Sequence, residues 1–214
     1  MAKAILFDMD GILIKSEPLW RESKNIILER HGLGKFSHIP MGTMGMTNKE
    51  AMETIMQISG LGGDVNTLVE ERASIVLSLA EQKLELFEGV KELIAEAKEK
   101  GMRTAVATAS PQRILDWVLE RFEMRGMFDG YANGDNGVRG KPNPDIFLRA
   151  AEAIGVPPEE CVVIEDAPHG IEAARRAGMK CIAVTNSYPR ERLSGAGLIV
   201  SGLREISAEE LMGW

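Results

Sequence analysis

Acidic, hydroxyl and ammonium side chains follow several short apolar runs of this sequence. The motif Asp-Met-Asp-Gly occupies residues 8–11, directly after the run at 4–7. Thr108 ends a second apolar run, a Glu-Asp pair at 165–166 ends a third, and Lys141 precedes a helical pattern. Because ligands of open parallel sheets bind beyond the carboxyl ends of the strands, these groups are expected to meet at one edge. The chemistry that suits such a set is phosphoryl transfer to a carboxylate.

Each of these side chains has a predicted role in that chemistry. Asp8 would attack phosphorus and form an acyl-phosphate. Asp10 would protonate the leaving oxygen and then activate water against the acyl-phosphate. Lys141 and the Thr108 hydroxyl would hold the remaining phosphoryl oxygens. A phosphate monoester is dianionic, so the approach of a carboxylate requires further compensation of charge.

A magnesium ion is the cofactor expected to supply that compensation. Its predicted ligands are Asp8, Asp166 and a backbone carbonyl near Asp10, which are oxygen donors suited to octahedral Mg²⁺. Glu165 would orient these ligands from a second layer. The predicted metal-site residues are therefore Asp8, Asp10, Glu165 and Asp166.

Each signal taken alone also has an ordinary structural explanation. Asp-x-Asp-Gly is a common turn composition, and a single lysine usually lies on a solvated surface. Thr108 alone suits a strand-end cap, and the pair at 165–166 suits the start of the next helix. A calcium-binding loop starting at Asp8 is excluded, because its fifth position is Ile12 and its twelfth is Leu19. The combination, in this order and at strand ends, favours an enzyme.

The elements that must position these groups alternate between strands and helices. Short apolar runs predict buried strands at 4–7, 104–107, 161–164, 181–184 and, more weakly, 198–200. Helical periodicity is present at 90–97, 114–122, 146–154 and 171–177, and a Ser110-Pro111 pair is expected to cap the second of these helices. The alternation predicts an α/β fold whose parallel sheet is covered by helices on both faces.

One stretch, from about residue 17 to 86, is helical throughout. Its first helix covers 18–30, its second begins with a capping box of Thr47 and Glu50, and its third is capped by Asp64. The segment 37–45 is predicted to be a loop, with its methionines used for packing. The predicted organisation is a catalytic core of residues 1–16 and 87–214, with a helical domain of residues 17–86 inserted after the first strand.

The composition limits the partners and the location. The 214 residues are 44% apolar and 27% charged, with a net charge of −7 and no Lys/Arg-rich run, so neither nucleic acid nor an anionic membrane is an expected partner. No apolar run approaches the ~20 residues of a membrane span, and no signal segment is recognised. Cys161 and Cys181 are predicted to be buried apolar side chains rather than a disulfide. A cytoplasmic monomer that acts on a small phosphorylated metabolite is expected.

The motifs together resemble those of the haloacid dehalogenase superfamily. Residues 8–11 are similar to its first motif, Thr108 to its second, Lys141 within Gly-Lys-Pro-Asn-Pro-Asp to its third, and Glu-Asp at 165–166 to its fourth. The resemblance implies a Rossmann-like core, Mg²⁺ as cofactor and a subclass I cap formed by residues 17–86. Such a cap closes over the site and opens again in each turnover.

Within the superfamily the chain is similar to the branch of β-phosphoglucomutase, phosphoglycolate phosphatases and the 2-deoxyglucose-6-phosphate or hexitol phosphatases. The runs Ser-Glu-Pro-Leu-Trp at 16–20 and Ala-Ser-Pro at 109–111 look most like the last group. The mutases have a histidine in place of Trp20 and a cap arginine in place of Asn48, so this chain looks less suited to a bisphosphate intermediate. The resemblance implies a sugar or polyol phosphate phosphatase, with a phosphosugar mutase as the alternative. The phosphate- or substrate-binding residues that it implies are Gly11, Ser16, Trp20, Asn48, Ala109 and Ser110.

A phospho-accepting signalling module also uses an acidic cluster, a threonine and a lysine on a parallel sheet. Asp10 disfavours this reading, because a second carboxylate beside the nucleophile shortens the life of the acyl-phosphate. An insertion the size of a cap also suits an enzyme that encloses a small substrate. Lys15 and His169 are left open between contact with substrate and a solvated surface position.

Overall fold

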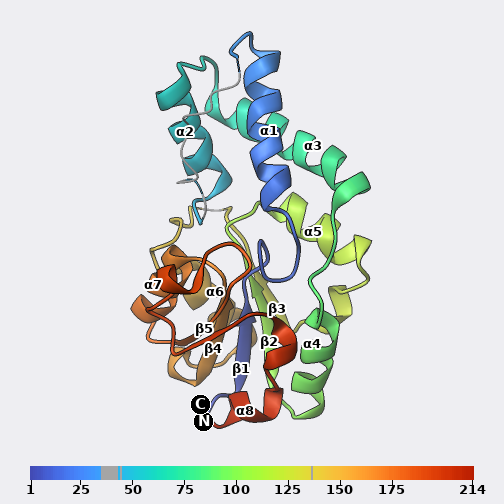
Figure 1. Ribbon diagram of the computed structural model, residues 1–214, viewed down its shortest axis with the longest axis vertical. Coiled ribbons are helices and arrows are strands. Elements are labelled where there is room, and N and C mark those ends of the chain that lie inside the picture. The colour runs from blue at the N-terminus through green and yellow to red at the C-terminus, as the bar shows by residue number, and fades with distance from the viewer. Residues whose placement is uncertain (35–42, 44, 136) are drawn as a thin grey trace.

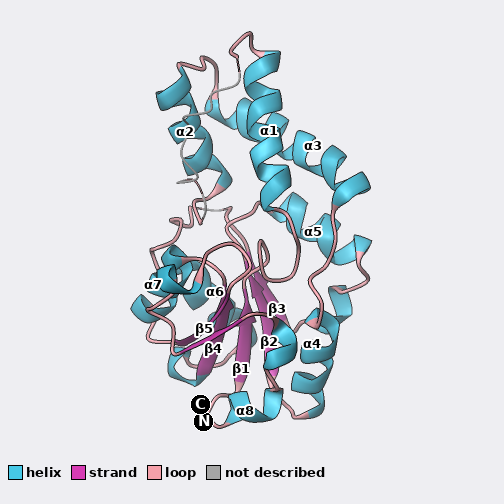
Figure 2. Cartoon of the chain, in the orientation of Figure 1, coloured by secondary structure: helices cyan, strands magenta, loops and turns pink. Residues whose placement is uncertain are grey.

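A six-stranded parallel sheet forms the centre of the molecule (Figures 1 and 2). The computed structural model describes residues 1–34, 43, 45–135 and 137–214. The strand order is β3-β2-β1-β4-β5-β6, so β1 lies between β2 and β4 and their carboxyl ends are adjacent. The strands are β1 (Ala4–Phe7), β2 (Arg103–Ala107), β3 (Gly130–Ala132), β4 (Cys161–Glu165), β5 (Lys180–Val184) and β6 (Leu198–Val200).

Helices cover both faces of the sheet, which explains why the central strand β1 is apolar at every position. Ile5 and Phe7 of β1 pack into one core with α4, α5 and α8, while Ala4 and Leu6 pack into the other with α6 and α7. Successive side chains of a strand point to opposite faces, so a strand covered on both faces has no solvent-facing side that would favour polar residues. The helices are α4 (Val90–Glu99), α5 (Gln112–Arg121), α6 (Asp145–Ile154), α7 (Pro168–Arg176) and α8 (Ala208–Met212).

Three helices lie together at one end of the molecule, beyond the carboxyl ends of the strands (Figure 1). They are α1 (Glu17–Arg30), α2 (Asn48–Ser59) and α3 (Val65–Lys83). A separate apolar core holds them together, with Ile27 and Leu28 from α1 against Met52 and Ile55 from α2. The insertion after the first strand therefore has a core of its own, and the predicted α/β fold with a helical insertion is confirmed.

The caps predicted for this insertion are present. Thr47 accepts the backbone N–H of Glu50, and the Glu50 carboxylate accepts the N–H of Thr47, which completes a capping box. The Asp64 side chain accepts the N–H of Thr67 at the start of α3. Side-chain oxygens satisfy N–H groups that have no partner within the helix, so each helix starts where its cap stands.

The two segments that enter and leave the insertion run side by side. Ile14 bridges Leu86, the Lys15 N–H donates to the Glu85 carbonyl at 2.9 Å, and the Phe87 N–H donates to the Leu13 carbonyl at 3.0 Å. The predicted domain boundaries fall on this pair of segments. The domain limits 1–16, 17–86 and 87–214 themselves stay a prediction.

One predicted cap is wrong. Helix α5 begins at Gln112 with Pro111 as its N-cap residue, and the Ser110 side chain caps nothing. Instead the Ser110 hydroxyl donates to Asp10 at 2.8 Å, and the carboxylate of Asp135 accepts the Gln112 N–H at 2.9 Å. The carboxylate of Asp135, which is distant in the sequence, thus binds the first N–H of α5 in place of the Ser110 hydroxyl. The Ser110 hydroxyl points toward Asp10 at the strand ends.

Strand β3 was not predicted from the sequence. It has only three residues, Gly130–Ala132, and it begins with glycine, a residue type that is depleted in strands. A Cβ atom at Gly130 would stand 2.6 Å from Cγ2 of Ile154, so close packing of α6 on this strand requires glycine. The packing that requires glycine at this position therefore also makes the strand hard to recognise from the hydrophobic pattern of the sequence.

The last features of the fold are the two cysteines, the segment 37–45, the apolar character of the helices and several short 3-10 helices. Cys161 and Cys181 are buried and unpaired, as expected. The predicted loop at 37–45 lies largely outside the described residues. Over the described ranges, no helix combines the length and the apolar character that crossing a membrane needs. Short 3-10 helices complete the chain at Arg125–Met127, Pro158–Glu160, Arg190–Arg192 and Leu203–Glu205.

Candidate active site

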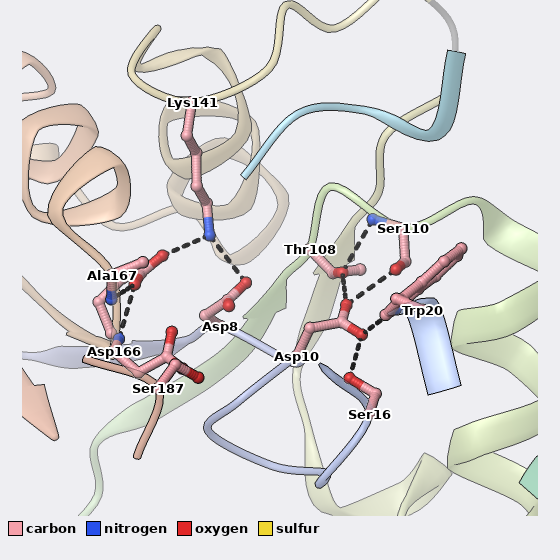
Figure 3. A network of polar contacts seen from close by, with 11 residues as sticks. Asp8, Asp10, Ser16, Trp20, Thr108, Ser110, Lys141, Asp166, Ala167 and Ser187 are labelled. Carbon is pink, nitrogen blue, oxygen red and sulfur yellow. Dashed lines mark hydrogen bonds and ion pairs between the residues drawn. The ribbon is translucent and has the colours of Figure 1, made fainter. Parts of the chain in front are cut away.

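Asp8 stands at the carboxyl end of the central strand β1, and a buried lysine holds it. The Lys141 ammonium donates to Oδ1 of Asp8 at 2.8 Å and to Oε1 of Glu165 at 2.6 Å (Figure 3). Lys141 is 5% exposed and Asp8 is 6% exposed. Ion pairs this far from water are little screened, so one ammonium fixes two carboxylates from different strands.

Both carboxylate oxygens of Glu165 accept hydrogen bonds from neighbouring groups of the protein. Oε1 accepts from Lys141, and Oε2 accepts the backbone N–H groups of Asp166 and Ala167 at 2.6 and 2.7 Å. A Cβ atom at Gly170 would stand 1.7 Å from Oε1 of Glu165, so the first turn of α7 needs glycine there. Glu165 is therefore placed to orient Lys141 and the turn that carries Asp166.

Three carboxylates gather closely enough to hold a cation. Asp8, Glu165 and Asp166 each offer an oxygen, and these oxygens lie within 4.8 Å of one another. One oxygen of Asp166 accepts the Ser187 hydroxyl, and one oxygen of Asp8 accepts from Lys141. Among the described residues, the other oxygen of Asp8 and of Asp166 has no hydrogen bond, so each carboxylate keeps one oxygen available. Buried oxygen donors of this kind suit a hard divalent cation.

The protonation behaviour of this cluster reflects an excess of negative charge. Burial raises the pKa of Asp8 to about 7; Lys141 opposes the shift, and the charges of Glu165 and Asp10 add to it. Burial, with Glu165 and Asp8, also raises the pKa of Asp166 well above its ordinary value. Burial alone would lower the pKa of Lys141, but the carboxylates of Asp8 and Glu165 raise it instead. A bound cation would offset the charge that a single ammonium leaves uncompensated.

Asp10 has a different environment, formed by four uncharged donors. Oδ1 accepts from the Ser16 hydroxyl at 2.5 Å and from the Trp20 indole N–H at 2.8 Å. Oδ2 accepts from the hydroxyls of Thr108 at 3.2 Å and Ser110 at 2.8 Å (Figure 3). We call these four residues the Asp10 cage. Two of them belong to the entrance of the insertion and two follow β2, so the cage ties Asp10 to both parts of the molecule.

Trp20 is itself held from inside the insertion. The Arg72 guanidinium lies 4.8 Å from the centre of the Trp20 ring and donates to the Trp20 carbonyl at 3.4 Å. Arg72 also donates to Oδ1 of Asn48 at 3.0 Å, and burial lowers its pKa to about 10. The Asn48 amide donates to the Val69 carbonyl at 3.4 Å. Asn48, a predicted substrate contact, thus directs its side chain to neighbours within the insertion.

The sequence model of the haloacid dehalogenase-like hydrolase family matches residues 5–184 of this chain. The chain belongs to this family. The match contains the strand ends that carry Asp8, Thr108 and the pair at 165–166, together with the helical insertion. The predicted family and the hydrolase class are therefore confirmed, and the helical insertion is the subclass I cap of this fold.

Individual proteins of known name or structure show which members of the family this chain is similar to. Hexitol phosphatase B of Escherichia coli is 33% identical over 98% of this chain and 96% of its own length. The crystal structure of CbbY from Rhodobacter sphaeroides in complex with phosphate has a TM-score of 0.84 and 32% identity, covering 96% of each chain. β-Phosphoglucomutase from Clostridium difficile has a TM-score of 0.88 at 23% identity, covering 100% of this chain and 96% of that one. This last likeness is one of fold.

The remaining predicted residues of this hydrolase fall around the same strand ends. Gly11 has a φ of +89° and a Cβ there would stand 1.9 Å from Oδ2 of Asp166, so the close approach of Asp166 requires glycine. Ala109 lies between two members of the Asp10 cage, and its carbonyl would stand 2.0 Å from a Cβ at Gly134. Lys15 forms an exposed ion pair with Glu85 at 2.7 Å. His169 has a buried Nδ1 without a hydrogen-bond partner among the residues described.

Two site residues were missed by the reading of the sequence. Ser187 donates to Asp166, and the Asn186 amide donates to the Gly11 carbonyl at 2.7 Å. Both come just after β5, at the same edge of the sheet as Asp8. The rule that ligands bind beyond the carboxyl ends of the strands applies to β5 as well, so listing the residues after that strand would have found them.

Proposed function

We propose that this hydrolase is a magnesium-dependent phosphatase that cleaves a sugar or polyol phosphate through an aspartyl-phosphate. The observation that carries the proposal is the placement of Asp8, with one oxygen on Lys141, beside Asp166 and two residues from Asp10. The similarity to hexitol phosphatase B supports a sugar or polyol phosphate as substrate. The complex of CbbY with phosphate supports a phosphate-binding site in this fold.

The proposed reaction has two steps that share the same carboxylates. Asp8 attacks phosphorus while the bond between phosphorus and the leaving oxygen breaks, and Asp10 gives its proton to that oxygen. Asp10 then takes a proton from water, which attacks the acyl-phosphate, releases inorganic phosphate and restores Asp8. Lys141 stays beside Asp8 and offsets negative charge in both steps. Thr108, proposed to contact a phosphoryl oxygen, also helps to hold Asp10.

The metal proposed for this site is Mg²⁺. Asp8 and Asp166 would hold it through their available oxygens, together with the backbone carbonyl of Asp10, while Glu165 keeps Lys141 and the turn after β4 in place. Bound Mg²⁺ would lower the cost of bringing a phosphate dianion to a carboxylate. The buried oxygen-only donor set and the excess of negative charge fit such an ion.

The proposed cap, residues 17–86, would enclose the part of the substrate beyond the phosphate. Ser16 and Trp20 already contact Asp10, and Gly11, Ala109 and Ser110 lie at the strand ends, so these positions are proposed to border the phosphate and the leaving group. The proposed partner is one small phosphorylated metabolite, bound by a monomer.

The test is phosphate release from a panel of phosphorylated metabolites in the presence of Mg²⁺. Hexitol phosphates, hexose 6-phosphates, 2-deoxyglucose 6-phosphate and hexose 1-phosphates should be compared at equal concentration. We expect release from at least one hexitol or hexose phosphate without an added bisphosphate. Isomerisation of a hexose 1-phosphate that depends on a sugar bisphosphate, with little phosphate released, would identify a phosphosugar mutase instead.

A further inference from the structure

The cap also contacts the core next to the catalytic lysine, away from the two linking segments. The Gly140 N–H donates to both oxygens of Glu50, at 3.0 and 3.1 Å. The next N–H, that of Lys141, donates to the Gly45 carbonyl at 2.9 Å. Two consecutive peptide groups of the loop that carries Lys141 are therefore bound to the cap.

Glu50 is a rigid anchor because the same carboxylate belongs to the capping box of α2. Its Oε2 accepts the Thr47 N–H at 2.8 Å and the Thr47 hydroxyl at 3.0 Å. A carboxylate with these partners cannot reorient freely, so the position of the Gly140 N–H is tied to the start of α2. Movement of α2 relative to the core would move this anchor.

Gly140 shows that this contact constrains the sequence. A Cβ atom there would stand 2.1 Å from Oε2 of Glu50, 2.9 Å from Cα of Met46 and 3.0 Å from N of Thr47. Gly140 is not among the glycines with positive φ, so its backbone conformation does not call for glycine. The close approach of the cap is the reason that the structure gives for glycine at this position.

We propose that Glu50 is a positioning residue that couples docking of the cap to the placement of Lys141. Lys141 binds Asp8 and Glu165 through its ammonium and the cap through its backbone, and Glu50 fixes the peptide group just before it. A displaced loop would move the ammonium away from Asp8, and small displacements of catalytic groups have large effects on rate. The proposal rests on the proposed function, in which Lys141 offsets the charge of the reacting phosphoryl group.

The chain contains a matched control for Glu50. Ser207 and Glu210 form a second capping box at α8, where Glu210 accepts the Ser207 N–H at 3.2 Å and the Ser207 hydroxyl at 2.9 Å. Glu50→Ala and Glu210→Ala therefore each remove the glutamate of a capping box. Only Glu50→Ala also removes the hydrogen bonds from the Gly140 N–H. We expect Glu50→Ala to lower kcat about tenfold with KM changed less than threefold, which corresponds to one charge-assisted hydrogen bond. Glu210→Ala should stay within about twofold of the parent in both constants.

A conservative variant separates positioning from stability. Glutamine also serves in a capping box and keeps one oxygen for the Gly140 N–H. Glu50→Gln should therefore have a kcat within about threefold of that of the parent. The remaining decrease reflects the weaker hydrogen bond that a neutral amide oxygen accepts compared with a carboxylate. If Glu50→Gln is as slow as Glu50→Ala, or if Glu50→Ala is as fast as Glu210→Ala, the proposal is wrong.

Hydrogen exchange tests the contact without any activity measurement. In Glu50→Ala the Gly140 amide should exchange at least about tenfold faster than in the parent, and in Glu210→Ala at the parental rate. A slower kcat with unchanged exchange at Gly140 would also overturn the proposal. If the parent releases no phosphate from any panel member, the proposed function fails, and exchange at Gly140 alone then decides whether Glu50 holds the loop.

Discussion

The two aspartates at the end of β1 stand two residues apart in opposite kinds of environment. Asp8 lies among charged groups, with Lys141 on one oxygen and two further carboxylates close by. Asp10 accepts four hydrogen bonds from uncharged donors of the Asp10 cage. The same residue type is therefore held by charge balance in one half of the site and by directed hydrogen bonds in the other.

The difference indicates two separate tasks. A buried cluster with an excess of negative charge gains from any cation that enters, so the Asp8 half is suited to binding a metal, which would in turn offset the charge of a phosphate. Neutral donors fix the direction of a carboxylate without strongly altering the charge around it, so the Asp10 half is suited to delivering and removing a proton. Variants in each half should therefore fail in different ways.

The largest effect is expected from Asp8→Asn. The amide keeps the size of the side chain but cannot form the acyl-phosphate, so phosphate release from p-nitrophenyl phosphate should fall at least about 1,000-fold. Circular dichroism of the variant serves as the control for folding. Residual turnover above one per cent of the parent would remove Asp8 from the role of nucleophile.

Lys141→Met should follow, with a loss of about 100-fold or more in kcat/KM, because the buried carboxylates lose their ammonium partner. Methionine resembles the lysine stem, so packing against the Phe147 ring, 5.0 Å from the ammonium, is largely kept. Lys15→Met removes an exposed lysine on one of the two segments that link the core and the insertion, and it should leave the rate within about twofold. Equal losses in the two variants would show that the charge of Lys141 has no special role.

Asp10→Asn should slow turnover about 100-fold, the usual contribution of a general acid and base. Its apparent affinity for Mg²⁺ should change less than about threefold, because the proposed metal contact at Asp10 is a backbone carbonyl. Titration of Mg²⁺ followed by thermal shift measures this affinity without turnover. A large loss of metal affinity in Asp10→Asn would show that the Asp10 side chain also contributes to metal binding, so that the two aspartates do not have separate tasks.

The pH dependence of metal binding sharpens the comparison further. The pKa of Asp8 is raised from 3.8 to about 7 in the folded chain, so between these values the folded protein holds a proton that the unfolded chain has lost. Without metal, this group's contribution to stability is largest below pH 4 and is lost as the pH rises to 7, by up to about 1.4 kcal/mol per pH unit. Mg²⁺ competes with that proton, so the increase in Tm on adding Mg²⁺ should grow from pH 5.5 to pH 8. An increase in Tm that is equal at both pH values, with EDTA-treated protein as the reference, would contradict this assignment.

The Asp8 half could be predicted from the sequence, and the Asp10 half only in part. Asp8, Lys141 and the pair at 165–166 could be identified because their combination and order along the chain are informative, although each residue alone has an ordinary structural explanation. The direction of the Ser110 hydroxyl was predicted wrongly, since a serine before a proline suits a helix cap equally well. Which of two short-range partners a hydroxyl selects depends on distances across the sheet, and these do not appear in a local pattern.

Contacts between the cap and the core were the least predictable part. The capping box at Thr47 was predicted and is confirmed, yet the second use of Glu50 on Gly140 depends on how α2 is docked. Arg72 gave no signal, because an arginine in a helix is normally solvated. Its burial against Trp20 follows from the packing of α1 on α3, which is a tertiary property.

The smallest expected effect tests the cap side of the Asp10 cage. Trp20→Phe keeps the ring beneath the Arg72 guanidinium and removes only the indole N–H, so Asp10 retains three of its four donors. One lost hydrogen bond of about 1 kcal/mol predicts a three- to sixfold decrease in kcat, with the affinity for Mg²⁺ unchanged. Trp117→Phe, a partly buried tryptophan on α5, is the matched control and should leave kcat within about twofold. If Trp20→Phe instead weakened Mg²⁺ binding while kcat stayed constant, the indole would act through the Asp8 half, and the division of labour between the two aspartates would be wrong.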